Sequence, residues 1–218
     1  MIELTDEQKC FLAGLLDAEG ALQITSGTIK IDLRMTEYYE IFKWLSQLFN
    51  NKIYVMHQNN KPIFIIQLHG FNAYELLLEI KDFLIIKQDN AEILLKAYES
   101  KDYEFYKEIL IPYTLRRGKI NPMREFNIKI GNDLMNSYLY GAYIGDGSIY
   151  FRKTRNVFRG SFGNKYYNAC KLYLDFCKFG CITYNKIANS WLWQWNGNGC
   201  YRRLLELGIS KDLPYWLK

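Results

Sequence analysis

Two acidic residues stand at matching places in two similar segments of the chain. Residues 11–20 read FLAGLLDAEG, and residues 138–147 read YLYGAYIGDG. Each segment is an apolar, helix-like pattern that ends in a carboxylate followed by glycine, Glu19 in the first and Asp146 in the second. Two carboxylates held together repel each other and favour a bound cation. Carboxylate oxygens with few other protein ligands suit Mg²⁺, so the pair predicts a site for a hard divalent ion.

Small residues four positions apart predict how the two segments meet. The pairs are Gly14 with Ala18 and Gly141 with Gly145. Residues at i and i+4 share one face of a helix, and Gly or Ala at both places lets two helix backbones approach closely. We therefore expect the two helices to pack against each other. Both acids would then lie at helix C-terminal ends, where the helix dipole disfavours negative charge.

These segments resemble the signature of the LAGLIDADG homing endonucleases. Residues 12–20 differ from the consensus at few positions, whereas residues 139–147 are looser but keep Gly141 and a terminal GDG. In that family the last acid of each motif binds the catalytic metals, a role that the resemblance carries over to Glu19 and Asp146. The alternative is that the segments are two ordinary core helices.

The backbone carbonyls of Ala18 and Gly145 are candidates for additional metal ligands. Asp17 does not align with the catalytic acid, so we expect it to cap or hydrogen-bond near the helix end. Ile144 occupies its place in the second copy.

The resemblance implies a metal-dependent DNA endonuclease that hydrolyses phosphodiester bonds in double-stranded DNA. The implied cofactor is Mg²⁺ or Mn²⁺, with Ca²⁺ as a non-cleaving substitute. A chain with two motifs forms its own pseudo-dimer, so we expect a monomer that acts on a long, non-palindromic target site.

Four further residues are candidates for the chemistry through the same resemblance. Residues 83–88 (FLIIKQ) resemble the segment that carries a catalytic lysine, which nominates Lys87, and Lys211 stands in the equivalent place of the second half. For both, the alternative is a solvated surface charge. Glu37 and Lys165 match a position after the second strand where a polar residue often positions water.

Sequence patterns predict an α+β fold of two pseudo-symmetric αββαββα units with antiparallel sheets, packed through the two motif helices. The resemblance implies the same fold, with saddle-like sheets. The predicted boundaries are 1–100 for the first unit, 101–132 for a connector and 133–218 for the second unit. The first unit is expected to contain helices 6–19, 37–49, 71–83 and 89–100 and strands 21–25, 28–36, 52–58 and 62–68. The second is expected to contain helices 133–144, 165–179 and 200–207 and strands 148–154, 157–162, 181–187 and 191–196.

Polar residues that alternate along the predicted strands are candidates for DNA contacts, because a two-stranded ribbon fits the major groove. The alternative is an ordinary solvent face of an antiparallel sheet. The candidates are Gln23, Thr25, Lys30, Asp32 and Arg34 in the first half and Tyr150, Arg152, Thr154, Gln194 and Asn196 in the second. Trp191, Trp193 and Trp195 also alternate, and we interpret them as core packing.

Charge divides unevenly along the chain. Residues 1–100 carry 9 Lys and Arg against 14 Asp and Glu, whereas residues 101–218 carry 19 against 9. The basic half indicates a polyanionic partner. The sequence has no apolar run long enough to cross a bilayer and no signal-peptide pattern at its start, which predicts an intracellular protein, in the cytoplasm or an organelle, rather than a secreted one.

Other functional classes fit the sequence less well. The cysteines Cys170, Cys177, Cys181 and Cys200 lack the paired spacing of zinc ligands. There is no phosphate-binding loop of the GxxxxGK[ST] type. The serious rival is an intron maturase or a cleavage-deficient DNA- or RNA-binding protein of the same fold. An intein-borne domain is a further alternative, although the sequence shows no splicing residues at its ends.

Overall fold

The computed structural model describes residues 3–25, 27–110 and 121–217. In the first half the elements are α1 (Asp6–Glu19), β1 (Gly20–Thr25), β2 (Thr28–Met35), α2 (Tyr39–Leu48), β3 (Ile53–Gln58), β4 (Lys61–His69), α3 (Phe71–Ile80), α4 (Gln88–Ser100) and α5 (Tyr103–Leu110). In the second half they are α6 (Met135–Asp146), β5 (Gly147–Arg152), the 3-10 helix η2 (Lys153–Arg155), β6 (Val157–Asn164), α7 (Tyr167–Cys177), β7 (Cys181–Asn185), β8 (Ser190–Asn196), α8 (Asn198–Glu206) and the 3-10 helix η3 (Tyr215–Leu217).

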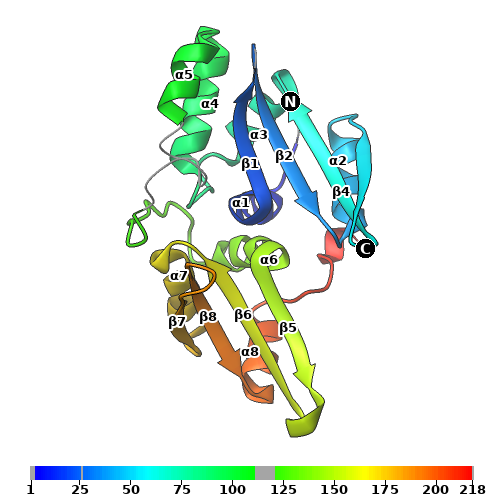
Figure 1. Ribbon diagram of the computed structural model, residues 1–218, viewed down its shortest axis with the longest axis vertical. Coiled ribbons are helices and arrows are strands. Elements are labelled where there is room, and N and C mark those ends of the chain that lie inside the picture. Colours follow the sequence, from blue (N-terminus) through cyan, green and yellow to red (C-terminus); the bar gives the residue numbers. More distant parts are fainter. Residues whose placement is uncertain (1–2, 26, 111–120, 218) are drawn as a thin grey trace.

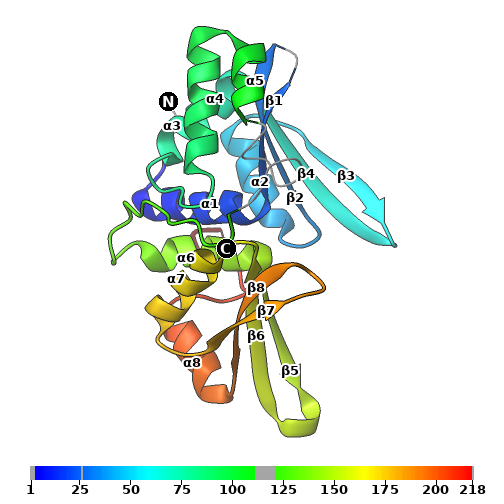
Figure 2. The same ribbon diagram turned by 60° about the vertical axis from the view of Figure 1, so that its left-hand side comes forward.

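The two halves repeat one architecture. Each contains a four-stranded antiparallel sheet, ordered β1-β2-β4-β3 in the first and β5-β6-β8-β7 in the second. Helices α1 and α6 lie side by side between the two sheets, which extend away from them in opposite directions (Figure 1). Turned by 60°, the molecule shows helices α3, α4, α7 and α8 on one side and the sheets on the other (Figure 2). The predicted fold class, two αββαββα units packed through the motif helices, is confirmed.

Glycines permit the close packing of α1 against α6. A Cβ atom added to Gly14 would lie 2.0 Å from the carbonyl oxygen of Tyr138, and one added to Gly141 would lie 2.0 Å from that of Phe11. Real carbon atoms cannot approach a carbonyl oxygen so closely. The two backbones therefore touch where the spacing of small residues predicted that they would.

Local signals set the ends of several elements. Thr5 and Gln8 form a reciprocal capping box that begins α1, as expected. The hairpin between β3 and β4 turns at Asn59 and Asn60, both of which have the positive φ that a tight hairpin turn needs.

Other element boundaries differ from the sequence expectation. Helix α2 begins at Tyr39 instead of Glu37, because Tyr38 adopts a left-handed conformation with φ of 63°. Helix α7 begins at Tyr167 instead of Lys165. The predicted helix 71–83 ends at Ile80, and α6 is shifted to Met135–Asp146, so that Asp146 is its last residue.

Part of the predicted connector is helical. Helix α5 occupies Tyr103–Leu110 and packs against α4. Residues 111–120, which include Pro112 and the basic residues at 116, 117 and 119, lie outside the described part of the chain. No helix in the described part of the chain is both long and apolar enough to cross a bilayer.

Aromatic side chains form the core of the second half. Trp193 is fully buried and stacks on Tyr173 of α7, with ring centroids 5.1 Å apart. Trp195 is also buried, whereas Trp191 is half-buried and contacts Tyr167 edge-on. The interpretation of the tryptophan alternation as core packing is confirmed for Trp193 and Trp195.

The close contact of the two motif helices gives a stability prediction. Gly14→Ala should lower the free energy of unfolding by about 3 kcal/mol, the upper end of the usual overpacking penalty, because the new methyl group forces α1 away from α6. Gly199→Ala in α8 is the matched control, since a Cβ there meets no atom within 4 Å. Urea unfolding followed by circular dichroism measures both. Equal stability of the two variants would contradict the backbone contact.

Candidate metal and nucleic-acid site

Glu19 and Asp146 lie together at the centre of the molecule. They are the last residues of α1 and α6. A Cβ atom added to Gly145 would lie 2.8 Å from Cγ of Glu19, so the Glu19 side chain covers Gly145, the neighbour of Asp146. The close approach of the helices thus brings the two acids, 127 positions apart in the sequence, to one end of the helix pair.

The surroundings of the two carboxylates disfavour their ionised forms. The Asp146 side chain is accessible to solvent, yet crowding by surrounding protein atoms raises its pKa to about 7, and the charge of Glu19 contributes to the same shift. Burial also raises the pKa of Glu19. A pair of acids whose ionised forms are disfavoured in the absence of a counter-ion is suited to a cation.

A lysine caps the C-terminal end of each motif helix. The Nζ atom of Lys87 donates hydrogen bonds to the carbonyl oxygens of Leu16 and Asp17, at 2.6 and 2.7 Å. The Nζ atom of Lys211 donates to the carbonyl oxygen of Ile144 at 2.7 Å. The last carbonyl groups of a helix have no partner within the helix, and a cation satisfies both their hydrogen bonding and the local dipole.

The charges of Lys87 and Lys211 act on both carboxylates. Both help to counter the rise in the pKa values of Glu19 and Asp146. Burial lowers the pKa of Lys211 to about 8 and also lowers the pKa of Lys87. Neither lysine is therefore the solvated surface charge that was the alternative reading of the sequence.

Asp17 anchors the segment that carries Lys87. Its buried carboxylate accepts hydrogen bonds from the backbone amides of Ile85, Ile86 and Lys87, at 2.8 to 2.9 Å, and from the Tyr138 hydroxyl at 2.7 Å. The expectation that Asp17 hydrogen-bonds near the helix end is correct, but its partners lie on a distant segment and on the other motif helix. Asp17 thereby joins α1, α6 and Lys87.

Glu37 and Lys165 occupy different environments, although sequence alignment makes them equivalent. The charge of Glu37 acts on Lys211 and counters the lowering of its pKa by burial. The structure therefore brings a residue of the first half to the lysine of the second. Within the described residues, Lys165 forms no hydrogen bond or ion pair with either carboxylate.

Asp32, one of the candidates for DNA contact, is directed toward its neighbours in the protein and not toward solvent. Its carboxylate is buried, accepts a bidentate pair of hydrogen bonds from Arg34 at 2.9 and 2.7 Å, and lies 3.2 Å from Nζ of Lys30. Gln67 on the neighbouring strand donates a further hydrogen bond at 3.1 Å. Asp32 instead holds two of the other candidates in fixed positions.

The remaining candidates for DNA contact are accessible to different degrees. Arg34 and Tyr150 are exposed by about half of their surface, at 54% for the Arg34 side chain and 53% for Tyr150. The exposed candidates also include Gln23, Thr154 and Asn196, and the partly buried ones are Thr25, Lys30, Arg152 and Gln194.

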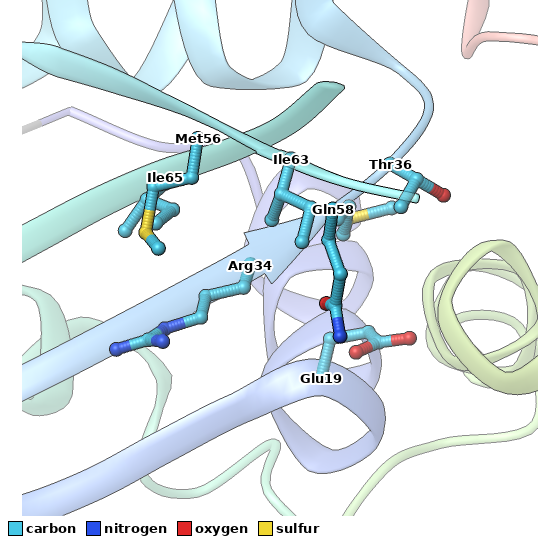
Figure 3. Close-up of a pocket in the computed structure, with 8 residues that line it drawn as sticks. Glu19, Arg34, Thr36, Met56, Gln58, Ile63 and Ile65 are labelled. Carbon is cyan, nitrogen blue, oxygen red and sulfur yellow. The ribbon is translucent and has the colours of Figure 1, made fainter. Parts of the chain in front are cut away.

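A hollow of about 350 Å³ connects Glu19 to the face of the first sheet (Figure 3). Its floor includes Ile63 and Ile65, and the Gln58 amide extends from β3 toward Glu19. Met56, Gln58 and Ile63, which line this hollow with Glu19, were not among the residues predicted from the sequence. The predicted hairpin at Asn59 and Asn60 indicates where β3 ends. Nothing in the sequence indicates that this end of β3 lies close to Glu19 on α1.

Two carboxylates fit a hard cation that keeps several waters. Among the described residues, no group of three or more His, Cys, Asp or Glu side chains is arranged to hold a metal ion. An ion between Glu19 and Asp146 would therefore take its other ligands from backbone carbonyls, water or a phosphate.

The anchoring role of Asp17 can be tested by stability measurements. Asp17→Asn should lower the free energy of unfolding by about 2–4 kcal/mol, because the amide cannot accept all four hydrogen bonds and some buried donors lose their partner. Asp175→Asn on the exposed face of α7 is the matched control and should change it by less than about 0.5 kcal/mol. Urea denaturation provides the comparison. A loss no larger than that of the control would contradict the anchor.

The acid pair predicts a pH-dependent gain in stability on substitution. Because the folded pKa of Asp146, about 7, lies above its ordinary value, the ionised carboxylate destabilises the folded protein at pH 8, and this penalty declines as the pH falls. Asp146→Asn should therefore raise the melting temperature in EDTA at pH 8, and by less at pH 5. Differential scanning calorimetry measures the shift. An equal shift at both pH values would contradict the acid pairing.

Comparison with known proteins identifies the fold. No protein family model matches the chain, and no curated protein sequence does. Among solved structures, the I-LtrWI LAGLIDADG homing endonuclease bound to target DNA matches 95% of this chain and 85% of its own, with a TM-score of 0.65 and 12% identity. The LAGLIDADG meganuclease I-AabMI bound to uncleaved DNA matches 91% of this chain and 82% of its own, with a TM-score of 0.63 and 15% identity.

A third match is I-SmaMI bound to an uncleaved DNA target in the presence of calcium ions. It covers 95% of this chain and 86% of its own, with a TM-score of 0.62 and 12% identity. At such identities the likeness establishes the arrangement of the chain and not its activity. The resemblance seen in the two motifs extends to the whole architecture, and the chain has the fold of the LAGLIDADG homing endonucleases.

Proposed function

We propose that this protein is a site-specific endonuclease of double-stranded DNA that uses a divalent metal ion. One observation carries the proposal: Glu19 and Asp146 meet at the seam of α1 and α6, and Lys87 and Lys211 flank them. Paired acids beside paired cations suit a reaction in which an anionic phosphodiester gains further negative charge.

Glu19 and Asp146 would hold the metal, and the backbone carbonyls of Ala18 and Gly145 are candidates for further ligands. When bound, such an ion supplies a Lewis acid and lowers the pKa of water near the scissile phosphate. Mg²⁺ suits this donor set best, Mn²⁺ is a substitute, and Ca²⁺ would support binding without cleavage. The structure of I-SmaMI bound to an uncleaved DNA target in the presence of calcium ions supports this choice.

The two lysines would neutralise charge that develops on the phosphate. Each ammonium group is already held in place by helix carbonyls, so little reorganisation accompanies the reaction. A nearby phosphate favours the protonated form of Lys211, whose pKa is about 8 in the free protein. Glu37 lies within electrostatic reach of Lys211 and would orient a water molecule there.

DNA would lie across the two sheets on the side away from the helices (Figure 2). Arg34 and Lys30, which Asp32 holds on the first sheet, would contact base edges or phosphates, and Arg152 would do so on the second. Because the two halves differ in sequence, the target would be long and non-palindromic, and one chain would suffice to bind it.

Substitution of Glu19 tests the metal assignment. Glu19→Gln should lower the rate of cleavage by at least about 100-fold, the effect of losing one key electrostatic group, while DNA affinity measured in Ca²⁺ stays within a few-fold of the parent. The assay uses Mg²⁺ and a duplex carrying the sequence that flanks the insertion locus of the encoding gene. Asp175→Asn is the control for loss of a surface carboxylate and should cleave normally.

The same assay separates the nuclease from its rival. Retained cleavage by Glu19→Gln would refute the metal assignment. If the parent leaves the DNA intact but promotes splicing of the host intron, the maturase function replaces the one proposed.

A further inference from the structure

We propose that residues 212–217, here called the strap, hold Lys211 in place by docking onto the opposite half of the molecule, and that Trp216 is the positioning residue. The consequence for catalysis rests on the endonuclease function proposed above. The strap would then control the cutting of only one of the two DNA strands.

The strap leaves the second half and packs against the first. The Trp216 ring lies 4.8 Å from the Trp44 ring on α2 and 5.3 Å from the Phe11 ring on α1, measured between ring centroids. The hydroxyl of Tyr215 donates a hydrogen bond to Glu7 at 2.9 Å. Figure 1 shows this segment crossing from α8 to the region of α2.

The strap begins directly after Lys211. The hydroxyl of Tyr140 on α6 donates a hydrogen bond to the carbonyl oxygen of Asp212, the first residue of the strap. Lys211 itself is half-buried, with its Nζ atom 5.7 Å from the ring centroids of Tyr38 and Tyr143. The backbone on the C-terminal side of Lys211 is therefore fixed between α6 and the aromatic contacts of Trp216.

The two active-site lysines are held by different means. The backbone around Lys87 is anchored by three hydrogen bonds to Asp17, and α4 follows directly. Ile144 stands at the matching place on α6, and its side chain, unlike that of Asp17, has no oxygen that could accept hydrogen bonds from backbone amides. In the second half the strap takes the role that Asp17 has in the first. Removal of the Trp216 side chain should therefore loosen Lys211 and leave Lys87 in place.

This difference has a consequence for the two strands. A duplex presents one scissile phosphate in each strand, and each of the two lysines would serve one of them. When Lys211 is displaced, one phosphate loses its neutralising charge while the other keeps Lys87. A loosened strap should therefore convert double-strand cutting into nicking.

Chemical labelling tests the positioning without any need for catalysis. The protein is treated with an amine-acetylating reagent, and the acetylation of each lysine is followed by mass spectrometry. In Trp216→Ala, Lys211 should be acetylated about tenfold faster or more, because local opening exposes it, while the rate at Lys87 stays unchanged. Trp216→Phe should restore most of the protection. Trp191→Ala, which removes another half-buried tryptophan of the second half, should leave both rates at the parent value.

Strand-resolved cleavage tests the consequence. A duplex selected by the parent protein from a randomised library is labelled differently on its two strands and cleaved in Mg²⁺. Trp216→Ala should cut one strand about tenfold more slowly or worse and the other within about twofold of the parent, because only one neutralising charge is lost. Nicked product should accumulate with this variant and not with Trp191→Ala.

The outcomes separate the strap from the proposed function. Equal slowing of both strands, or an unchanged acetylation rate at Lys211, would overturn the role of the strap even in an active nuclease. If the parent cleaves no DNA, the endonuclease function fails, and the acetylation rates alone decide whether Trp216 positions Lys211.

Discussion

The backbone contact between α1 and α6 is the constraint on which the rest of the structure depends. Gly14 faces a carbonyl oxygen of α6, and Gly141 faces one of α1, at distances that exclude any side chain. This contact joins two sheets that otherwise extend in opposite directions, and it sets the separation of the helix ends. Glu19 and Asp146 come together because they are the last residues of two helices whose backbones are in contact.

The same contact places two acidic side chains close together, and two lysines from other parts of the chain partly offset their charge. Two acids share one seam at helix C-termini, where helix dipoles and mutual repulsion both disfavour their ionised forms. Lys87 and Lys211 relieve part of this by binding the terminal carbonyls, but burial disfavours their own charges. In the proposed function, a divalent ion and a phosphate would neutralise the charges that remain in this cluster.

The pseudo-symmetry of the two halves is broken at several places around this seam. Asp17 anchors the first lysine, whereas Ile144 leaves the second to the strap and Trp216. Asp32 organises cations on the first sheet, and the second motif has no matching acid on its strand β6. In the proposed function each half would meet a different DNA sequence, so the two halves of a single chain could diverge in this way.

The repeat of small residues and terminal acids was enough to predict the helix pair and the meeting of Glu19 with Asp146, because these follow from one packing rule. The order of helices and strands was predicted from hydrophobic periodicity and turn residues. The order of the strands within each sheet was not predicted and is seen only in the structure. Only the tertiary structure decided that Asp32 is buried, that Gln58 approaches Glu19, and that Trp216 reaches the opposite half. Each of these depends on sheet curvature or on contacts between distant segments, and neither leaves a periodic pattern in the amino-acid sequence.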